Sequence, residues 1–465
     1  MQIPILNGIY ADENSDFRTS YPLNLIPVPK STGISSGYLR PAEGIKHLAS
    51  TPGIDRGAIR WDDICYRVCG QRLIRVNEDG TVTDLGFVGG SEQVSMDYSF
   101  DYLAIASGGN LYYYDKNTIQ QVTDPDLGTA LTVQYIDGYF MTTDGEFIVV
   151  SDLDDPFSFN PLKYGSSEVD PDPILGTTKV HDEAHALNRY TIEVFDNVGG
   201  AGFPFQRVDG GHISRGVLGA HCNAVYMEMV AFLGSGRNEP PSVWIAAGGT
   251  SQKIATREVD VLINAYSEKV LAATVMESRV QDGHTWLYIH LPDFCLVYDA
   301  TGSGEAGTPV WFKLASGTSP QKYRAVNHVW CYNKWIVGDT KSPSVGTMTD
   351  KIGTHWGDLT IWEFGTIVLY NDSMGGIIHE LEIVCLPGRM ALGVEPTVAT
   401  QYSTDGEVWS QLKYIKVGTE GQRNKRLVWF GQGRMSDRRM QKFCGTSESR
   451  LSIARLEARV EPLSF

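Results

Sequence analysis

The sequence predicts an all-β protein with a six- or seven-bladed β-propeller, an extended N-terminal arm and a C-terminal β-sandwich-like domain. Three observations support this prediction. The 465 residues include 49 glycines, and 42% of them are hydrophobic and 11% aromatic, which suits a folded chain of short strands and tight turns. A strand-turn-strand pattern recurs about every 40 residues, as in propellers. Beyond about residue 355 strands continue without that repeat.

Residues 1–54 are expected to form the extended arm. Pro22, Pro27, Pro29 and Pro41 lie in this segment among glycines and serines. Proline removes a backbone donor and disfavours helix in the residue before it. The arm is therefore expected to cover another surface or to reach a neighbouring subunit.

The propeller is expected over residues 55–354. Each repeat joins two strands by a turn of Asp, Asn or Gly, as in "RLIRVNEDGTVTDLG". Seven apolar positions mark the repeats, at Leu73, Leu111, Phe147, Ile192, Val243, Leu296 and Ile336, in steps of 38, 36, 45, 51, 53 and 40 residues. Sheets stacked in a ring cover one another and lose most of their exposed edges. Unrelated hairpins in two sandwiches are the alternative.

Two other segments depart from the repeat. Near 256–275, Val259, Ile263 and Tyr266 have helical spacing, which predicts a short helical insertion in the propeller. Residues 355–465 contain alternating strands such as "TVATQYSTDGEVWSQLKYI", which predict the C-terminal β-sandwich.

The overall charge bears on possible partners and location. The formal net charge is −16, which argues against a protein whose main task is to grip nucleic acid phosphates. Seven scattered cysteines indicate free thiols in a reducing cytoplasm. The sequence shows neither a signal peptide nor an apolar run long enough to span a membrane. We therefore expect a soluble protein that is made in the cytoplasm without export.

Three motifs suggest chemistry but fit it poorly. "SDLDDPFSFNP" (151–161) is acidic, but its aromatic interruption does not fit a calcium loop, and a solvated turn is the favoured interpretation. "HDEAH" (181–185) lacks the glutamate spacing of a zinc protease helix, so a polar turn is expected. "STDGEVW" (403–409) resembles the structural Asp-box turn of sialidase-type propellers. No nucleophile elbow or phosphate-binding loop is found, so no catalytic, cofactor-binding or metal-binding residue is assigned.

One candidate interaction patch stands out because it is basic in an otherwise acidic chain. Its members are Arg423, Lys425, Arg426, Arg434, Arg438 and Arg439. They could form a solvated strand face, or a patch that docks on an acidic partner subunit or a DNA backbone.

Several collinear segments together resemble one protein family. They include "SSGYLRPAEGI" (35–45), "YRVCGQRLIRV" (66–76), "QVSMDYS" (93–99), "SDLDDPFSFNPLKYGSSEVDPDPILG" (151–176), "RYTIEVFDN" (189–197), "VMESRVQDGHTWLYIHLPDFCLVYDATG" (275–302) and "STDGEVWSQ…KRLVWFGQGR" (403–434). The chain resembles the tail hub, or nozzle, family of short-tailed double-stranded DNA bacteriophages, also called packaged-DNA stabilisation proteins.

The resemblance implies a non-enzymatic structural protein of the virion tail. Family members form a ring, usually a homohexamer, below the portal and the head-to-tail adaptor ring. They extend the DNA channel, retain packaged DNA until ejection, and carry tailspikes, tail fibres or a needle. Double-stranded DNA would pass without sequence-specific contact. We expect a net negative lumen that repels phosphates, with the basic patch facing protein.

Two alternatives predict a different function. A propeller glycosidase acting on host surface polysaccharide would need a pocket with converging carboxylates. A lectin-like module would use exposed aromatics, for which Trp330, Trp335 and Trp356 are candidates, although tryptophans in propellers more often pack between blades.

Overall fold

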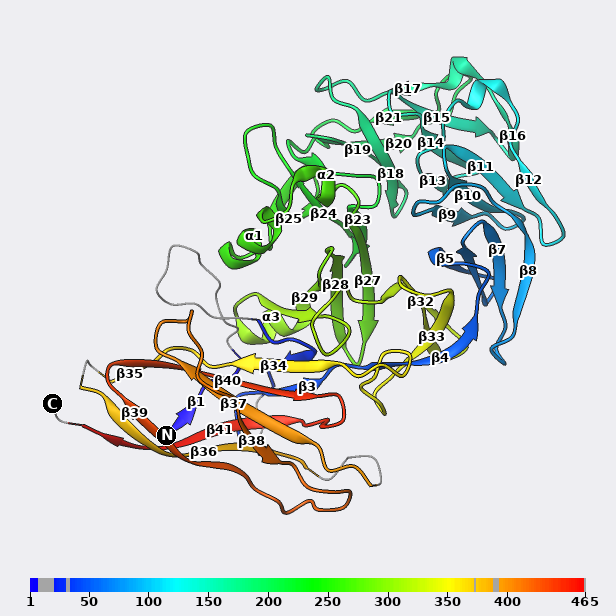
Figure 1. Ribbon diagram of the computed structural model, residues 1–465. Coiled ribbons are helices and arrows are strands. Elements are labelled where there is room, and N and C mark those ends of the chain that lie inside the picture. The colour runs from blue at the N-terminus through cyan, green and yellow to red at the C-terminus, as the bar shows by residue number, and fades with distance from the viewer. Residues whose placement is uncertain (7–20, 31–33, 372–373, 388–392, 464–465) are drawn as a thin grey trace. The chain divides into compact units, whose positions relative to one another are not determined.

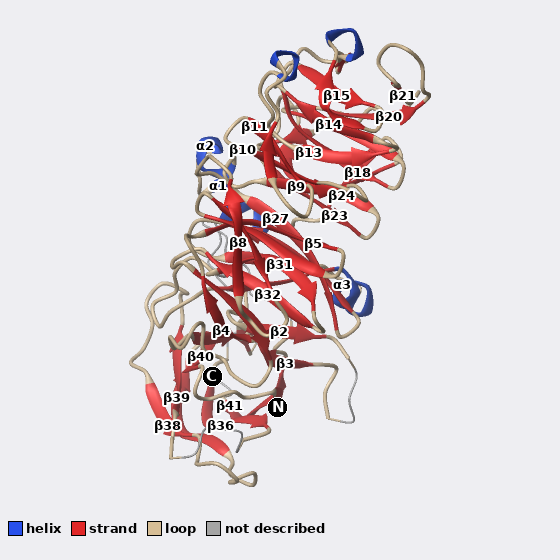
Figure 2. Ribbon diagram, turned by 90° about the vertical axis from the view of Figure 1, so that its right-hand side faces the viewer, coloured by secondary structure: helices blue, strands red, loops and turns tan. Residues whose placement is uncertain are grey.

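The computed structural model describes residues 1–6, 21–30, 34–371, 374–387 and 393–463 (Figure 1). Strands dominate and the helices are short (Figure 2). The chain divides into two compact units: unit 1 comprises residues 1–46, 280–323 and 348–465, and unit 2 comprises residues 47–279 and 324–347. Within the described residues no helix has the length and apolar character needed to cross a membrane.

Unit 2 is built from successive antiparallel sheets that follow the sequence repeat. Its strands are, sheet by sheet, β5 (Asp55–Trp61), β6 (Ile64–Cys69), β7 (Arg72–Val76) and β8 (Val82–Phe87); β9 (Ser95–Tyr98), β10 (Leu103–Ser107), β11 (Asn110–Tyr114) and β12 (Ile119–Gln121); β13 (Val133–Ile136), β14 (Tyr139–Thr143), β15 (Phe147–Asp152), β16 (Asp155–Phe159) and β17 (Gly165–Ser166); β18 (Ile174–Val180), β19 (Glu183–Asn188), β20 (Ile192–Asn197) and β21 (Phe205–Arg207); β22 (Gly216–Val217), β23 (Asn223–Tyr226), β24 (Met229–Ser235), β25 (Ser242–Ala247) and β26 (Thr250–Lys253); β31 (Ala325–Cys331), β32 (Lys334–Asp339), β33 (Ser344–Thr349) and β4 (Gly44–Ser50). A further sheet has the order β27 (Val275–Gln281), β28 (His284–His290), β29 (Cys295–Asp299) and β30 (Val310–Leu314).

Residues 44–349, all of them described, thus form seven sheets, one for each marked repeat. Six of the marks fall on the third strand of a sheet, whereas Ile336 falls on β32, the second strand of its sheet. The short helices are η1 (Pro125–Leu127), η2 (Pro161–Lys163), α1 (Arg257–Asn264), α2 (Glu268–Leu271) and α3 (Ala300–Ala306). Both α1 and α2 lie in the stretch where helical spacing was seen, and Val259 and Ile263 form the buried face of α1.

The N-terminal segment, predicted to be an arm, contributes four strands from its described residues. β1 (Gln2–Ile3), β2 (Leu25–Val28) and β3 (Tyr38–Pro41) join a sheet of unit 1, and β4 is the last strand of the sheet β31-β32-β33-β4. Residues 7–20 and 31–33 of the predicted arm lie outside the described residues. Because β4 comes from the N-terminal segment and β31, β32 and β33 come from residues 325–349, two segments distant in sequence share one sheet.

A buried ion pair connects the first sheet of unit 2 to the last. Arg67 Nε on β6 donates to Asp55 Oδ2 on β5 over 2.6 Å, and both side chains are 0% exposed. Asn327 Nδ2 on β31 donates to Asp55 Oδ1 over 2.6 Å, and Arg67 Nη2 donates to the Asn327 carbonyl over 3.0 Å. Gly338 on β32 leaves room for this contact, because a Cβ there would lie 2.2 Å from Asp55 Cγ.

Apolar side chains fill the space around this ion pair. The core cluster between the first and last sheets contains Cys65, Cys69, Ile74, Val76, Val329, Cys331, Ile336 and Val345. All seven cysteines of the chain are free thiols. In the described structure Cys65 and Cys69 thus serve as small buried side chains, the interpretation favoured over a zinc site.

Unit 1 contains two sheets that share one apolar core. One sheet has the order β2-β3-β41-β36-β39, with β1 beside β41; its later strands are β36 (Gly376–Cys385), β39 (Leu427–Met435) and β41 (Ile453–Pro462). The other has the order β34-β40-β37-β38, with β35 beside β40; its strands are β34 (Ile361–Gly365), β35 (Leu369–Tyr370), β37 (Thr397–Ser403), β38 (Lys413–Lys416) and β40 (Arg438–Thr446). Trp362, Phe364, Trp429 and Phe443 belong to the shared core.

The buried ion pair predicts that two substitutions in the same sheet, one on β5 and one on β8, lower stability by different amounts. Asp55→Ala leaves the Arg67 guanidinium buried without its carboxylate, so the free energy of unfolding should fall by roughly 3–5 kcal/mol. Asp84→Ala removes the partner of Arg72 in a pair whose side chains are both 43% exposed, so the loss should be about 0–1 kcal/mol. Urea unfolding followed by circular dichroism measures both, and equal losses would contradict the role assigned to Asp55.

Candidate functional site

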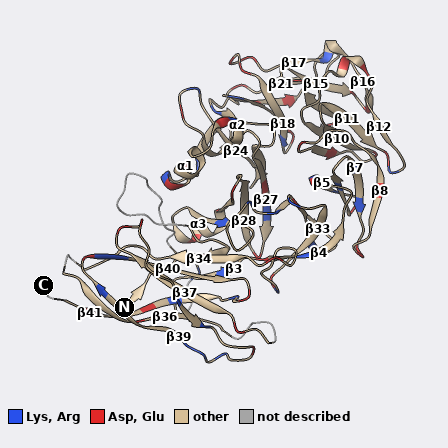
Figure 3. Ribbon diagram, viewed as in Figure 1, with Lys and Arg blue, Asp and Glu red and all other residues tan. Residues whose placement is uncertain are grey.

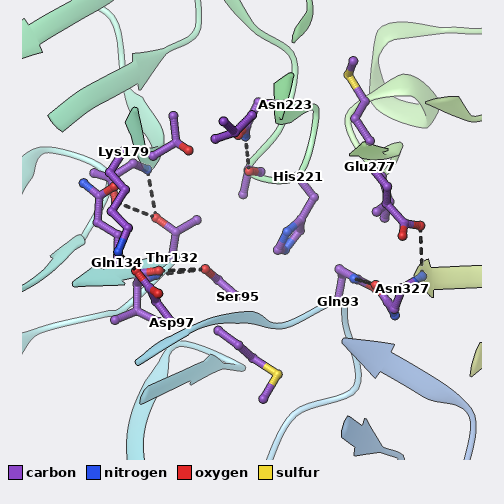
Figure 4. Close-up of a pocket in the computed structure, with 18 residues that line it drawn as sticks. Gln93, Ser95, Asp97, Thr132, Gln134, Lys179, His221, Asn223, Glu277 and Asn327 are labelled. Atoms are coloured by element: carbon purple, nitrogen blue, oxygen red, sulfur yellow. Dashed lines mark hydrogen bonds and ion pairs between the residues drawn. The ribbon is translucent and has the colours of Figure 1, made fainter. Parts of the chain in front are cut away.

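A polar cavity of about 330 Å³ lies in unit 2, where the first strands of its sheets converge (Figure 4). Its walls come from the β8–β9 connection, β9, β13, β18, the β22–β23 segment, β27 and β31. The polar lining residues are Gln93, Ser95, Asp97, Thr132, Gln134, Thr177, Thr178, Lys179, His221, Asn223, Glu277 and Asn327. These strands are neighbours in space but belong to different sheets, so their side chains make most of the connections.

One group of contacts joins β9, β13 and β18. Lys179 Nζ donates to Asp97 Oδ2 over 2.8 Å and to the Tyr135 carbonyl over 2.6 Å, while the Tyr135 N–H donates to Asp97 Oδ2 over 2.7 Å. Ser95 Oγ and the backbone of Val133 form a reciprocal pair of hydrogen bonds at 3.0 and 3.1 Å. The charges of Lys179 and Asp97 therefore neutralise each other in the cavity wall.

A second group fixes the only glutamate of the lining. Glu277 accepts the N–H of Asn327 over 2.9 Å and the N–H of His328 over 2.7 Å, and it contacts His328 Nδ1 at 2.9 Å. Gln93 Nε2 donates to Asn327 Oδ1 over 2.7 Å. Asn327 thus links the cavity wall to the buried Asp55–Arg67 pair. Hydrogen bonding of both its oxygens holds the Glu277 carboxylate in the wall.

Two further lining residues differ in their environment. Burial lowers the pKa of His221 to about 4, so its imidazole is uncharged at neutral pH. Gln134 is 3% exposed; its Nε2 lies 3.0 Å from Met141 Sδ, and its Oε1 has no hydrogen-bond partner among the described residues. None of the cavity residues was singled out from sequence. Within the family resemblance, however, "QVSMDYS" (93–99) carries four of them and the segment 275–302 carries three.

The structure separates the six members of the predicted basic patch. Arg423 and Arg434 are exposed, Lys425 Nζ lies 3.7 Å from Glu395, and Arg426 Nε donates to Glu382 over 2.8 Å. Arg438 Nε donates to the Thr404 carbonyl over 3.3 Å.

Arg439 is only 1% exposed and lies over the Tyr402 ring at 3.9 Å, and burial lowers its pKa to about 10. Its Nη1 donates to the Gln432 carbonyl over 2.7 Å. Arg439 thus packs inside unit 1, whereas Arg423 and Arg434 are exposed.

The three suspected motifs all contain turns. Leu153 and Asp154 form the exposed turn between β15 and β16, and the hydrogen bond from Lys163 lowers the pKa of the neighbouring Asp152. His181 and Asp182 form the β18–β19 turn. These observations confirm the two turn interpretations.

The third motif closes through Asp405 in the β37–β38 connection. Asp405 Oδ1 accepts the N–H groups of Glu407 and Val408, each over 2.9 Å, and these bonds lower its pKa. Among the tryptophans proposed for a lectin-like site, Trp330 and Trp335 pack together with ring centroids 5.4 Å apart.

Charge is distributed unevenly between the two units (Figure 3). Unit 2 contains 33 Asp and Glu against 19 Lys and Arg, a formal charge of −14. Unit 1 contains 22 against 20. Almost all of the net negative charge of the chain therefore belongs to unit 2.

Within unit 2 the turns at one end of the sheets are acidic. In an up-and-down sheet of four strands, the turn between the first and second strands and the turn between the third and fourth strands lie at the same end. The turn between the second and third strands lies at the opposite end. We call the charged residues of the first set the acidic end: Asp62, Asp63, Glu78, Asp79, Asp101, Asp115, Asp137, Asp154, Asp182, Glu228 and a single lysine, Lys116. The turns at the opposite end contain Asp144, Glu146, Glu239, Arg189, Arg237 and Lys341.

Few of these carboxylates are neutralised by neighbouring cations. Lys116 pairs with Asp62 and Arg60 pairs with Asp63. The acidic end stays strongly negative after both pairs are counted, whereas acids and bases at the opposite end balance. The net negative charge of these turns is therefore concentrated at one end of the sheets of unit 2.

Comparison with known proteins then places the chain in a family. The family model described as Bacteriophage P22 Gp10, beta-propeller, matches residues 1–353, and the model described as Bacteriophage P22 Gp10, beta-sandwich, matches residues 361–461. The chain belongs to the P22 Gp10 family. The tail hub protein gp10 of Salmonella phage P22 is 30% identical over 378 residues, covering 76% of this chain and 78% of that protein.

This membership confirms the resemblance to phage tail hub proteins and the all-β propeller-and-sandwich class. It supports a structural, non-enzymatic protein of the virion tail, and it does not favour the glycosidase alternative.

Solved structures with distant similarity include the following two. PorZ of Porphyromonas gingivalis has a TM-score of 0.40 at 12% identity, covering 80% of this chain and 46% of its own. The Pan2 WD40 domain of Neurospora crassa has a TM-score of 0.42 at 7% identity, covering 65% and 94%. Similarity at this level carries no argument about function.

Buried histidines predict that unit 2 loses stability in mild acid. Burial lowers the pKa of His185 on β19 to about 4, as it does for His221. The unfolded chain takes up these protons near pH 6.5, so stability should fall as pH drops from about 6.5 towards 4, by up to roughly 1.4 kcal/mol per pH unit for each histidine. Thermal unfolding of His185→Leu at pH 7 and pH 5 should show a smaller loss than the parent protein.

The matched control is His181→Asn in the exposed turn of the same hairpin. Asparagine tolerates the positive φ of 53° at this position. The control should keep the parent pH dependence, and a flattened profile in this variant rather than in His185→Leu would contradict the assignment.

Proposed function

We propose that this chain is a structural subunit of a phage tail hub that extends the DNA channel and retains packaged DNA until ejection. The observation that carries the proposal is the match of both P22 Gp10 family models, which together span nearly the whole chain. A homohexameric ring below the portal and adaptor, with attached tailspikes, fibres or needle, is the arrangement we infer for it. Its partners would then be other copies of the chain and neighbouring tail proteins.

The electrostatics of unit 2 support a particular role for its acidic end. DNA phosphates are repelled by a wall of carboxylates, and the cations there, Lys116 and Arg60, are already paired with Asp62 and Asp63. We infer that the acidic end lies beside the DNA path, so that the genome slides past it with little adhesion. Retention would then depend on closure of the channel by protein and not on binding of DNA by the wall.

Unit 1 supplies the complementary part of this proposal. Two exposed members of the basic patch, Arg423 and Arg434, lie in a unit with almost no net charge. We infer that they meet an acidic protein surface and that the patch contributes to assembly. Arg439 would act from within unit 1, by fixing the strand that carries Arg438.

A charge reversal at the acidic end should slow the passage of DNA. Glu228→Lys places a cation in the β23–β24 turn, so phosphates would adhere and DNA release from particles should slow several-fold at low salt and recover at high salt. Glu146→Lys, in a turn at the opposite end, is the matched control and should leave release unchanged. Dye-detected DNA release after receptor triggering measures both. Equal slowing by the two variants would contradict the proposed orientation.

Reversing the exposed basic residues should weaken assembly. The double variant Arg423→Glu and Arg434→Glu should bind partner tail proteins at least ten-fold more weakly, since like charges would meet at the interface. Lys351→Glu, an exposed residue of the same unit, controls for the general change of charge. Particle reconstitution followed by electron microscopy tests this. Normal incorporation of the double variant, with DNA release altered in its place, would assign the patch to DNA.

A further inference from the structure

We propose that the cavity in unit 2 binds a small uncharged molecule rich in hydroxyl groups, such as a polyol or a monosaccharide. This proposal is independent of the tail hub role. It concerns the space inside one subunit, and it rests on the volume of the cavity, its lack of unpaired charge and the hydrogen-bonding groups of its wall.

The volume suits a small ligand. At about 330 Å³ the cavity lies at the lower end of the range of roughly 300–1,000 Å³ that small-molecule sites occupy. Its lining draws on several sheets at once, so a bound molecule would contact β9, β13, β18, the β22–β23 segment, β27 and β31 together (Figure 4). Such a ligand would connect strands that share no backbone hydrogen-bond ladder.

The charges of the wall argue against an ionic ligand. Lys179 is the only Lys or Arg among the lining residues, all of which are described, and it is paired with Asp97 and the Tyr135 carbonyl. Glu277 accepts three hydrogen bonds from Asn327 and His328. A phosphate would meet no uncommitted cation, and an organic cation would compete with donors already in place. The wall therefore presents little free charge of either sign.

Apart from the uncharged imidazole of His221, the remaining polar groups are amides and hydroxyls. They are the side chains of Gln93, Ser95, Thr132, Gln134, Thr177, Thr178, Asn223 and Asn327. The lining contains no Phe, Tyr or Trp, which disfavours a flat aromatic ligand. Neutral donors and acceptors of this kind match hydroxyl groups, each of which donates one hydrogen bond and accepts two.

Gln134 has a buried side-chain acceptor that a ligand could satisfy. A buried acceptor without a partner costs about 1–3 kcal/mol, and Gln134 Oε1 is such an acceptor among the described residues. The contact of its Nε2 with Met141 Sδ at 3.0 Å orients the amide, because the opposite orientation would place two acceptors together. A ligand hydroxyl would supply the missing donor once the side chain turns this oxygen towards the cavity.

Gln134→Met separates a ligand-binding role from a structural one. Methionine has a similar length but lacks the amide oxygen. Because Gln134 Oε1 has no hydrogen-bond partner among the described residues, losing this oxygen removes no hydrogen bond of the fold. The melting temperature should therefore stay the same or rise, while the affinity for myo-inositol or D-glucose should fall at least five-fold. Gln252→Met, on the exposed surface of β26, is the matched control and should change neither quantity.

Calorimetric titration of the full chain with myo-inositol, D-glucose, inorganic phosphate and spermidine provides the test. Saturable binding of a polyol or sugar that weakens in Gln134→Met alone supports the proposal. Tighter binding of phosphate or spermidine would overturn the assignment of a neutral ligand. Absence of any binding, or polyol binding that Gln134→Met leaves unchanged, would overturn the site itself.

Discussion

The buried Asp55–Arg67 pair, with Asn327, is the interaction on which the architecture of unit 2 depends. Successive sheets of a propeller each leave a face that only the next sheet can cover, so the first and last sheets must meet. Here that meeting is made by two charged side chains with no exposure to water and by Asn327. The Asn327 side-chain amide donates to Asp55, and its backbone carbonyl accepts from Arg67. The same Asn327 continues into the cavity wall through Gln93. Closure and the central cavity are consequently parts of one hydrogen-bond network.

Much of the fold could be predicted from the sequence because it is repetitive and local. Seven apolar marks gave seven sheets, and six of them fall on corresponding strands. Ile336 differs because the last sheet receives its fourth strand, β4, from the N-terminal segment. Pairing between segments so distant leaves no periodic signal, which is why the strands β1 to β4 were not recognised within the predicted arm.

The candidate sites were less predictable than the fold. The cavity is lined by one to three residues from each of several strands, so no short motif carries it. The basic patch was identified from proximity in sequence, but alternation along a strand sends neighbouring residues to opposite faces. Arg438 and Arg439 are adjacent on β40, yet only Arg439 is almost fully buried.

The acidic end shows how turn chemistry and charge combine. Two-residue hairpin turns require positive φ, which Asp, Asn and Gly adopt most readily, and Asp62, Asp63 and Asp137 have φ values of 48°, 60° and 49°. Asparagine would satisfy that geometry without charge, as Asn333 does in the β31–β32 turn. Glu228 also has positive φ although its side chain gives no advantage in such a turn. Backbone conformation alone therefore does not explain why so many turns of the acidic end carry Asp or Glu.

The place of β4 in the last sheet has a consequence for biosynthesis. The ribosome makes this strand about 300 residues before β33, its neighbour in the sheet. At a synthesis rate of about 5–20 residues per second, the strand waits roughly 15–60 s for its partner. During that interval its backbone groups are an open edge that another nascent chain could occupy. Folding of the propeller is thus completed only late in translation, and the crowded polysome is where mispairing between copies would begin.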